Sequence, residues 1–231
     1  MNLAIILLLI GIDAVTFGPG NRFHLEHSTG NGSFGMQSHG VIEALDGNKT
    51  KFYPLPQSTP KQYAKLRPED IKINPLPPGS YEREEFIGPW QIENANIWFG
   101  NNFYDSEGSH GVGAFGFFDT ATRKYTLYSP PEVARYQISA ILVQPDILWL
   151  GLDRFVEDIS TVSGGLASWN RATHEVHRYP VEFAVSGISP EGDSLRLNNS
   201  RGSYAIFHNG DIRRFLAGKP VAKFPPLPTH Y

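Results

Sequence analysis

The sequence PDILWLGLDRF, residues 145–155, is an apolar run that ends at a glycine and then turns polar. Two earlier segments have the same form: NIWFGNNF at residues 96–103 and AVTFGPGNRF at residues 14–23. Aligning Gly100 with Gly151 sets an offset of 51 residues (151 − 100), and the segment FFDTATRKYTLYSP, residues 117–130, then falls on SWNRATHEVHRYPV, residues 168–181, without a gap. The chain therefore repeats one structural unit.

Each copy contains four short β-rich runs separated by Gly, Asp, Asn or Pro turns, which is the pattern of a meander. A further copy has its turn in IEALDGNKTKFYPLP, residues 42–56, and a weaker one runs through residues 193–215, with a hairpin signal at Asn209-Gly210. Repeats of roughly 40–50 residues with four strands each are typical of propeller blades. The sequence predicts an all-β fold, a β-propeller of about four four-stranded antiparallel blades.

The expected blades cover approximately residues 3–53, 86–130, 134–181 and 183–217, in a single domain of 231 residues. In the third blade we expect strands near residues 136–143, 147–151, 165–169 and 175–179. The repeated phrase is then the second strand of a blade, and Trp98, Trp149 and Thr16 share one position that packs between blades.

Three segments need separate interpretation. If Gly18 is aligned with Gly151, the apolar residues 6–12 form a buried first strand; a signal peptide is the alternative, although no Lys or Arg precedes the segment, and it is too short to span a bilayer. Residues 54–85 are a proline-rich insertion. In the tail, residues 218–231, the segment KPVAKF is a candidate to pair back onto the first blade and cover an open edge.

Composition excludes several classes of partner. The net charge is only −3 and no run of Lys or Arg occurs, so we expect no nucleic-acid partner. The chain has no cysteine, which excludes disulfides and thiolate metal sites. The cysteine-free composition is compatible with the cytoplasm and with an extracytoplasmic compartment, so the localisation stays unknown.

The blades resemble a known group of repeats. The segments IWFG…GVGAFGFFDTATRKYTLYSP and LWLG…SGGLASWNRATHEVHRYP are similar to blades of the two-component-regulator-type and streptogramin-lyase-type β-propellers. Those blades carry an aromatic-Gly strand, a Gly-Gly-apolar strand and a D-x-x-T turn before an aromatic-Pro exit. The resemblance implies the fold, and it implies little about activity because propellers carry many functions.

The long loops predict a working face. The insertions at residues 21–40, 101–111 and 152–165 all join a second strand to a third strand, on the same face as the blade-to-blade connections. Turns on the opposite face, such as residues 46–49 and 170–173, stay short. Loops presented by a rigid scaffold commonly carry function.

These loops are rich in side chains that bind ligands. An aromatic stands early in each loop, and Arg22 and Arg154 are candidates to bind a carboxylate or phosphate. If the loops converge near the axis, their imidazoles and carboxylates are candidates to bind a divalent metal. The expected ligand-binding residues are Arg22, Phe23, His24, His27, Phe103, Tyr104, Asp105, His110, Arg154, Phe155 and Glu157. We expect no cofactor; the alternative is a divalent metal with His24, Asp105 and Glu157 as ligands.

Two functions follow. The first is a non-catalytic propeller that binds a small ligand, glycan or protein on the face with the long loops. The alternative is a metal-assisted lyase or hydrolase of the streptogramin-lyase-like type, for which no residue is assigned a catalytic role. A structural hypothesis is a homodimer that completes a larger ring, because the resembled families usually close six to eight blades.

Overall fold

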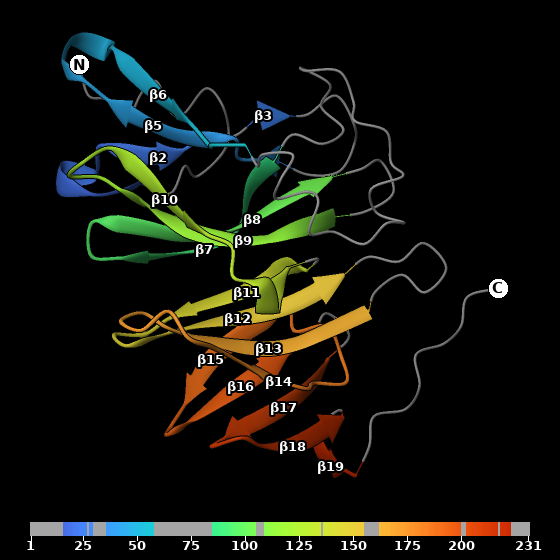
Figure 1. The fold of residues 1–231 in the computed structure, drawn as a ribbon. Coiled ribbons are helices and arrows are strands. Elements are labelled where there is room, and N and C mark those ends of the chain that lie inside the picture. Colours follow the sequence, from blue (N-terminus) through green and yellow to red (C-terminus); the bar gives the residue numbers. More distant parts are fainter. Residues whose placement is uncertain are drawn as a thin grey trace.

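The computed structural model describes residues 16–26, 28–29, 36–57, 85–104, 109–134, 136–154, 162–199, 202–216 and 218–222. These residues form the expected all-β, propeller-like fold, with four antiparallel sheets of four or five strands that follow one another along the chain (Figure 1). Residues 1–15, most of the proline-rich insertion and the end of the tail lie outside the described residues, and so does the expected first strand at residues 6–12.

Sheet 1 contains β1 (Thr16–Phe17), β2 (Phe23–Leu25), β5 (Gly40–Ala44) and β6 (Thr50–Pro54), and a small hairpin, β3 (Ser28–Thr29) with β4 (Met36–Gln37), lies beside it. Sheet 2 contains β7 (Glu85–Glu93), β8 (Asn96–Tyr104), β9 (Ser109–Asp119) and β10 (Lys124–Tyr128).

Sheet 3 contains β11 (Gln137–Val143), β12 (Ile147–Arg154), β13 (Val162–Asn170) and β14 (Val176–Tyr179). Sheet 4 contains β15 (Gly187–Glu191), β16 (Ser194–Asn198), β17 (Ser203–His208), β18 (Asp211–Leu216) and β19 (Lys219–Val221). Three short 3₁₀ turns, η1 (Pro19–Asn21), η2 (Asp46–Asn48) and η3 (Pro131–Val133), occur in the connections. In the part of the chain described, no helix has the length and apolar character needed to cross a bilayer.

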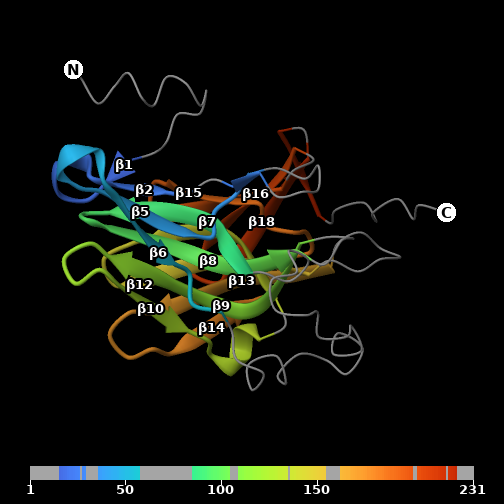
Figure 2. The ribbon, with the colours of Figure 1, turned by 90° about the horizontal axis from the view of Figure 1, so that it is seen from above.

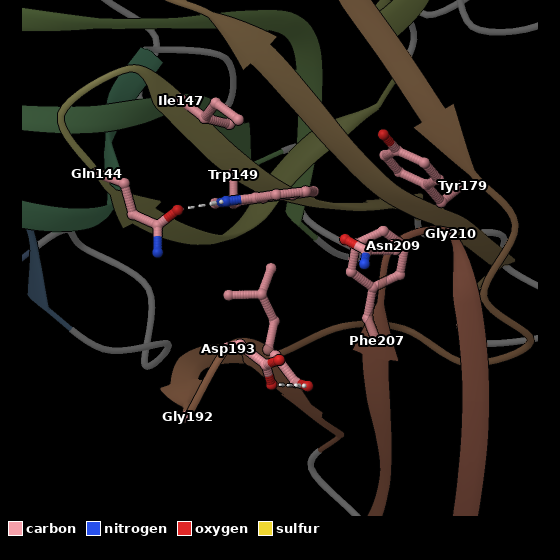
Figure 3. Close-up of a pocket in the computed structure, with 11 residues that line it drawn as sticks. Gln144, Ile147, Trp149, Tyr179, Gly192, Asp193, Phe207, Asn209 and Gly210 are labelled. Carbon is pink, nitrogen blue, oxygen red and sulfur yellow. Dashed lines mark hydrogen bonds between the residues drawn. The ribbon is translucent and has the colours of Figure 1, made fainter.

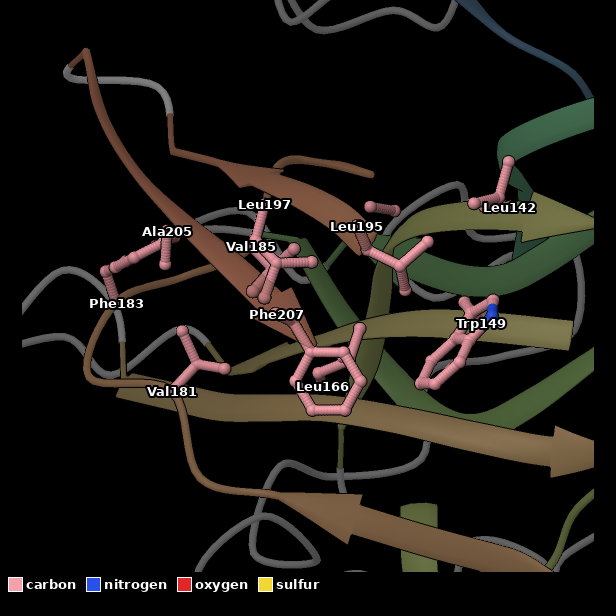
Figure 4. Close-up of a cluster of buried hydrophobic side chains, with 11 residues drawn as sticks. Leu142, Trp149, Leu166, Val181, Phe183, Val185, Leu195, Leu197, Ala205 and Phe207 are labelled. Carbon is pink, nitrogen blue, oxygen red and sulfur yellow. The ribbon is translucent and has the colours of Figure 1, made fainter. Parts of the chain in front are cut away.

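The sheets stack in chain order (Figure 1), and seen from above they lie over one another (Figure 2). Side chains alternate between the two faces of each strand, so a sheet between two others buries both of its faces. One apolar cluster fills each contact between successive sheets: Phe23, Ile97 and Phe118 between sheets 1 and 2; Trp98, Leu150 and Trp169 between sheets 2 and 3; and Trp149, Leu195 and Phe207 between sheets 3 and 4 (Figure 4).

Two turns on the short-turn face have the same hydrogen bonds. The Asp119 carboxylate accepts from the backbone N–H groups of Ala121 and Thr122, and the Asn170 side chain accepts from the equivalent pair in sheet 3. Such side-chain-to-backbone bonds are why Asp and Asn favour turns. They fix the two loops in one shape despite different sequences.

The sequence alignment of Gly18 with Gly151 is wrong. Gly18 and Gly20 have positive φ (76° and 65°), so the chain reverses there and Phe17 pairs with Phe23. The second strand of sheet 1 is therefore β2, and residues 14–17 are not its equivalent. Pairing across the sheets sets Leu25, Gly100 and Gly151 in one row, opposite Val41, Phe115 and Leu166. Phe23, and not Thr16, then takes the position of Trp98 and Trp149.

The tail also differs from expectation. Lys219–Val221 extends sheet 4 as β19, where Val221 pairs with Arg214 of β18, and among the described residues it has no pairing with sheet 1. Sheets 1 and 4 lie at opposite ends of the stack (Figure 1). The described residues thus form an open row of four sheets.

One buried carboxylate joins sheets 1 and 2. Glu43, whose side chain is 1% exposed, accepts from both Arg123 Nε and Arg123 Nη2 at 2.9 Å, from Arg22 Nη2 at 3.0 Å and from the Tyr53 hydroxyl at 2.7 Å. The Arg123 guanidinium, aided by Tyr53 and Arg22, lowers the pKa of Glu43 to about 2, against the opposing effect of burial.

We expect Glu43→Gln to lower the free energy of unfolding at pH 7 by about 2–3 kcal/mol, less than for a fully buried pair because both arginines are partly exposed. A lowered pKa stabilises the fold above the usual value of 4.5, and this stabilisation is lost as the pH falls from there towards 2. Urea unfolding should therefore show the difference between wild type and variant shrinking over that range.

Glu182→Gln is the control, because the Glu182 side chain pairs with Arg214 and is 40% exposed, whereas that of Glu43 is 1% exposed. It should cost less than about 1 kcal/mol. Equal losses for the two variants would contradict the role of Glu43.

Candidate functional site

A cavity of about 410 Å³ opens between sheets 3 and 4, at the end of the stack with the short turns (Figure 3). Three connections surround it: the β11–β12 turn at Gln144 and Ile147, the β15–β16 turn at Gly192 and Asp193, and the β17–β18 turn at residues 209–210. Ligand sites in proteins commonly enclose about 300–1,000 Å³. The cavity is large enough for a small organic molecule.

Aromatic side chains form one wall. Trp149, Tyr179 and Phe207 have ring centroids 4.7–6.1 Å apart, and both contacts of Phe207 are edge-to-face. Because the rings contact one another, they leave no space between them for a ligand group, and they offer instead one continuous apolar surface. Strand alternation places all three on the faces through which sheets 3 and 4 meet.

Polar groups form the rim. Trp149 Nε1 donates to Gln144 Oε1 at 2.9 Å, which fixes the amide beside the indole ring. Asp193, Ser194 and Asn209 line the opposite side, and the Asp193 side chain is 86% exposed. Among the described residues that line the cavity, Asp193 carries the only formal charge. The cavity therefore offers acceptors, hydroxyl and amide groups, and a single negative charge.

The cavity exists because the β17–β18 turn is tight. His208 pairs with Asp211, so Asn209 and Gly210 alone make the turn, both with positive φ (49° and 94°). This is the turn geometry that Asn-Gly favours in two-residue hairpins. In sheet 3 the matching β13–β14 connection is longer, because Trp169 pairs with Val176.

A serine, a histidine and an aspartate meet beside the cavity without forming a catalytic triad. Ser194 Oγ lies 3.1 Å from His208 Nδ1, and Asp193 Oδ1 lies 3.7 Å from the same nitrogen. In a triad the hydroxyl and the carboxylate contact opposite ring nitrogens, so that the carboxylate orients the base. Here the second nitrogen, Nε2, faces the Asn209 amide at 3.1 Å. The arrangement does not activate Ser194.

The structure distributes the residues expected to bind ligand over several places. Phe23 and Phe103 are buried in the stack. Arg22 binds Glu43 at the short-turn end, whereas Arg154 ends β12 at the opposite end, so the two do not form a clamp. His24 alternates with Phe23 and Leu25, which pack on sheet 2, and so lies on the outer face of sheet 1.

The other expected residues are placed only in part. The backbones of Tyr104 and His110 belong to the β8–β9 pairing. His27, Asp105, Phe155 and Glu157 lie outside the described residues, so the expected metal set of His24, Asp105 and Glu157 stays a prediction. Among the described residues no group of three His, Asp or Glu side chains could hold a metal ion.

The end of the stack with the long loops carries buried polar side chains. Asn102 bridges sheets 2 and 3, since its amide donates to the Ile138 carbonyl at 2.9 Å and accepts from the Ile138 N–H at 3.0 Å. Asp153, 7% exposed, accepts from its neighbour's N–H at 2.6 Å and from Gln137 Nε2 at 3.3 Å. Burial raises the pKa of Asp153 to about 6 despite these hydrogen bonds.

Comparisons with known proteins give limited information. No protein-family model and no curated protein matches the sequence. Two solved structures are similar: the extracellular domain of the putative one component system BT4673 from B. thetaiotaomicron, with 10% identity and a TM-score of 0.42, and YjhT, with 12% identity and a TM-score of 0.39. Each match covers 90% of this chain, which spans 28% of the first structure's chain and 67% of the second's.

Asp153→Asn should become more stable, relative to wild type, as the pH rises. Because burial raises the pKa of this acid, wild type loses stability between pH 3.8 and about 6, where the folded protein gives up a proton that the unfolded chain has already released. We expect the difference in unfolding free energy between variant and wild type to change by about 1–3 kcal/mol across this window.

Chemical unfolding at pH 4 and pH 7 measures this change. Asp146→Asn is the control, because Asp146 is an exposed turn residue of the same sheet. A pH-independent difference for Asp153→Asn would show that its carboxyl is not destabilised by burial.

Proposed function

We propose that this chain is a non-catalytic binding module that takes a small ligand in the cavity between sheets 3 and 4. One observation carries the proposal: an aromatic wall of Trp149, Tyr179 and Phe207 faces a polar rim across an open cavity of about 410 Å³. Ligand sites combine such apolar surface with a few placed polar groups that give orientation and specificity.

The geometry at the rim favours binding over turnover. Asp193 is exposed to solvent, and it shares one nitrogen of His208 with Ser194. A general base needs a hydrogen-bond partner that holds it in the reactive tautomer. Asp193 and Ser194 are thus suited to contact a ligand through hydrogen bonds, without a chemical step.

The metal-assisted lyase or hydrolase on the long-loop face ranks below this proposal. The His24 imidazole lies on the side of sheet 1 that faces away from β8 and β12, the strands that lead into the other two loops. Thermal unfolding in EDTA, followed by Ca²⁺, Mg²⁺, Mn²⁺ or Zn²⁺, tests the alternative. The alternative requires that one ion raise the thermal unfolding midpoint of wild type and leave that of His24→Ala unchanged.

Binding in the cavity should depend on Trp149. We expect a ligand-observed NMR screen of neutral sugars, guanidinium compounds and small carboxylates to yield at least one class that binds wild type. Trp149→Phe, which shortens the aromatic wall and removes the N–H donor to Gln144, should weaken that binding by about tenfold.

Trp90→Phe is the matched control, because Trp90 is an exposed tryptophan on sheet 2, away from the cavity. It should bind like wild type. A ligand that binds both variants equally well would place the site elsewhere on the molecule.

A further inference from the structure

Trp98, at the contact between sheets 2 and 3, occupies the position equivalent to Trp149 of the cavity, but an arginine covers Trp98. Arg171, in the β13–β14 turn, places its guanidinium carbon 4.9 Å from the centre of the Trp98 ring. Its Nη1 and Nη2 donate to the two Glu93 carboxylate oxygens at 2.7 and 2.8 Å, and Nη1 also donates to the Gln144 carbonyl at 2.8 Å. This guanidinium thus lies over an aromatic ring and is bound by both oxygens of one carboxylate.

The contact between sheets 3 and 4 reproduces this arrangement without the arginine. Trp149 stands 51 residues after Trp98 (149 − 98), and Gln144 stands 51 residues after Glu93 (144 − 93). Each tryptophan donates its indole N–H to that partner, at 3.1 Å in Trp98 and at 2.9 Å in Trp149. The tryptophan and its acceptor are therefore in the same positions in both contacts.

The missing element is the side chain from the next sheet. In sheet 3 the turn after the third strand supplies Arg171, whereas in sheet 4 the corresponding turn is Asn209-Gly210, which lines the cavity. The turn of sheet 2 likewise sends Arg123 to Glu43 of sheet 1. At the contact between sheets 2 and 3, the Arg171 side chain thus occupies the space that is left as the cavity between sheets 3 and 4.

We propose that the cavity binds the guanidinium group of an arginine-containing ligand, stacked on Trp149 and held by Gln144 and Asp193. The inference rests on the proposed function and names its ligand class. A planar guanidinium stacks on aromatic faces and donates in a fixed fork, which an ammonium group cannot do. Gln144 keeps the acceptor oxygen of Glu93 but not its charge, and Asp193 supplies a negative charge at the rim.

Calorimetric titration of the full chain with N-acetyl-arginine amide tests the inference. Its comparison ligands are the lysine and citrulline analogues, which lack the planar fork or the charge, and glucose. The arginine compound should bind at least about tenfold more tightly than the other three. Affinity should also fall as salt rises, because Asp193 is exposed and screened.

Two variants sharpen the test. Gln144→Glu restores the carboxylate that Glu93 provides to Arg171, and should raise affinity for the arginine compound by about tenfold. Asp193→Asn should lower that affinity by about fivefold, and leave glucose binding unchanged. Asp146→Asn, in the equivalent turn of sheet 3, serves as the control and should change neither.

The outcomes separate the two proposals. If glucose, or a carboxylate from the NMR screen, binds in a Trp149-dependent manner and the arginine compound does not, the guanidinium inference is wrong and the binding function stands. Equal affinity for the arginine and citrulline compounds would also overturn the inference, because charge would then play no part. If no compound binds wild type, both proposals fail.

Discussion

The stack of described sheets depends on one constraint, which is that an inner sheet must bury both of its faces. A strand shows alternate side chains to opposite sides, so a sheet with apolar residues at every position needs a neighbour on each side. β12 meets this condition, since Leu148 and Leu150 pack toward sheet 2 while Trp149 packs toward sheet 4. Stacking in chain order gives each inner sheet a neighbour on both sides.

Stacking then leaves the turns to close the ends of each contact. An arginine from the turn of the following sheet reaches back onto the preceding one at two contacts, as Arg123 does to Glu43 and Arg171 does to Glu93. The Arg171 guanidinium lowers the pKa of Glu93 and keeps its carboxyl ionised at the edge of the contact. Where the turn has only two residues, no side chain reaches back, and a cavity remains. Turn length thus separates a structural contact from a candidate binding site.

The sequence predicted the parts of the fold that depend on local pattern. Alternating apolar residues gave the strands of sheet 3 within a few residues, and Asp119 and Asn170 marked turns that side-chain hydrogen bonds fix. The first blade was misaligned, because Gly18 repeats a local motif while its positive φ, which the motif does not encode, reverses the chain there. The register of β2 in sheet 1 follows from its pairing with β5, and the apolar-Gly motif of residues 14–23 alone does not determine it.

The candidate site was missed for a related reason. The long loops predicted Arg22 and His24 as ligand-binding residues, whereas the cavity lies beside the short β17–β18 turn. Two signals were present in the sequence: the Asn209-Gly210 pair, and the replacement of Glu93 by Gln144 at an offset of 51 residues (144 − 93). Neither signal predicts a cavity by itself, because the sequence does not show that Arg171 covers Trp98 and binds Glu93. The cavity is therefore defined by the absence of a side chain equivalent to Arg171. This absence can be recognised only when the packing of the sheets is known.

Among the described sheets, the outer faces of sheets 1 and 4 do not pack against a further sheet, unlike the faces inside the stack. On the outer face of sheet 4, Arg196 lies 3.6 Å from the centre of the Tyr204 ring, which stacks on Phe215, so the sheet covers its own aromatic residues. The outer face of sheet 1 has His24 beside Ile42 and Phe52, of which Phe52 is 47% exposed. A second copy that packed on the outer face of sheet 4 would have to desolvate the Arg196 guanidinium and the Tyr204 ring. The new interface of such a homodimer must therefore offset this desolvation cost before it adds stability.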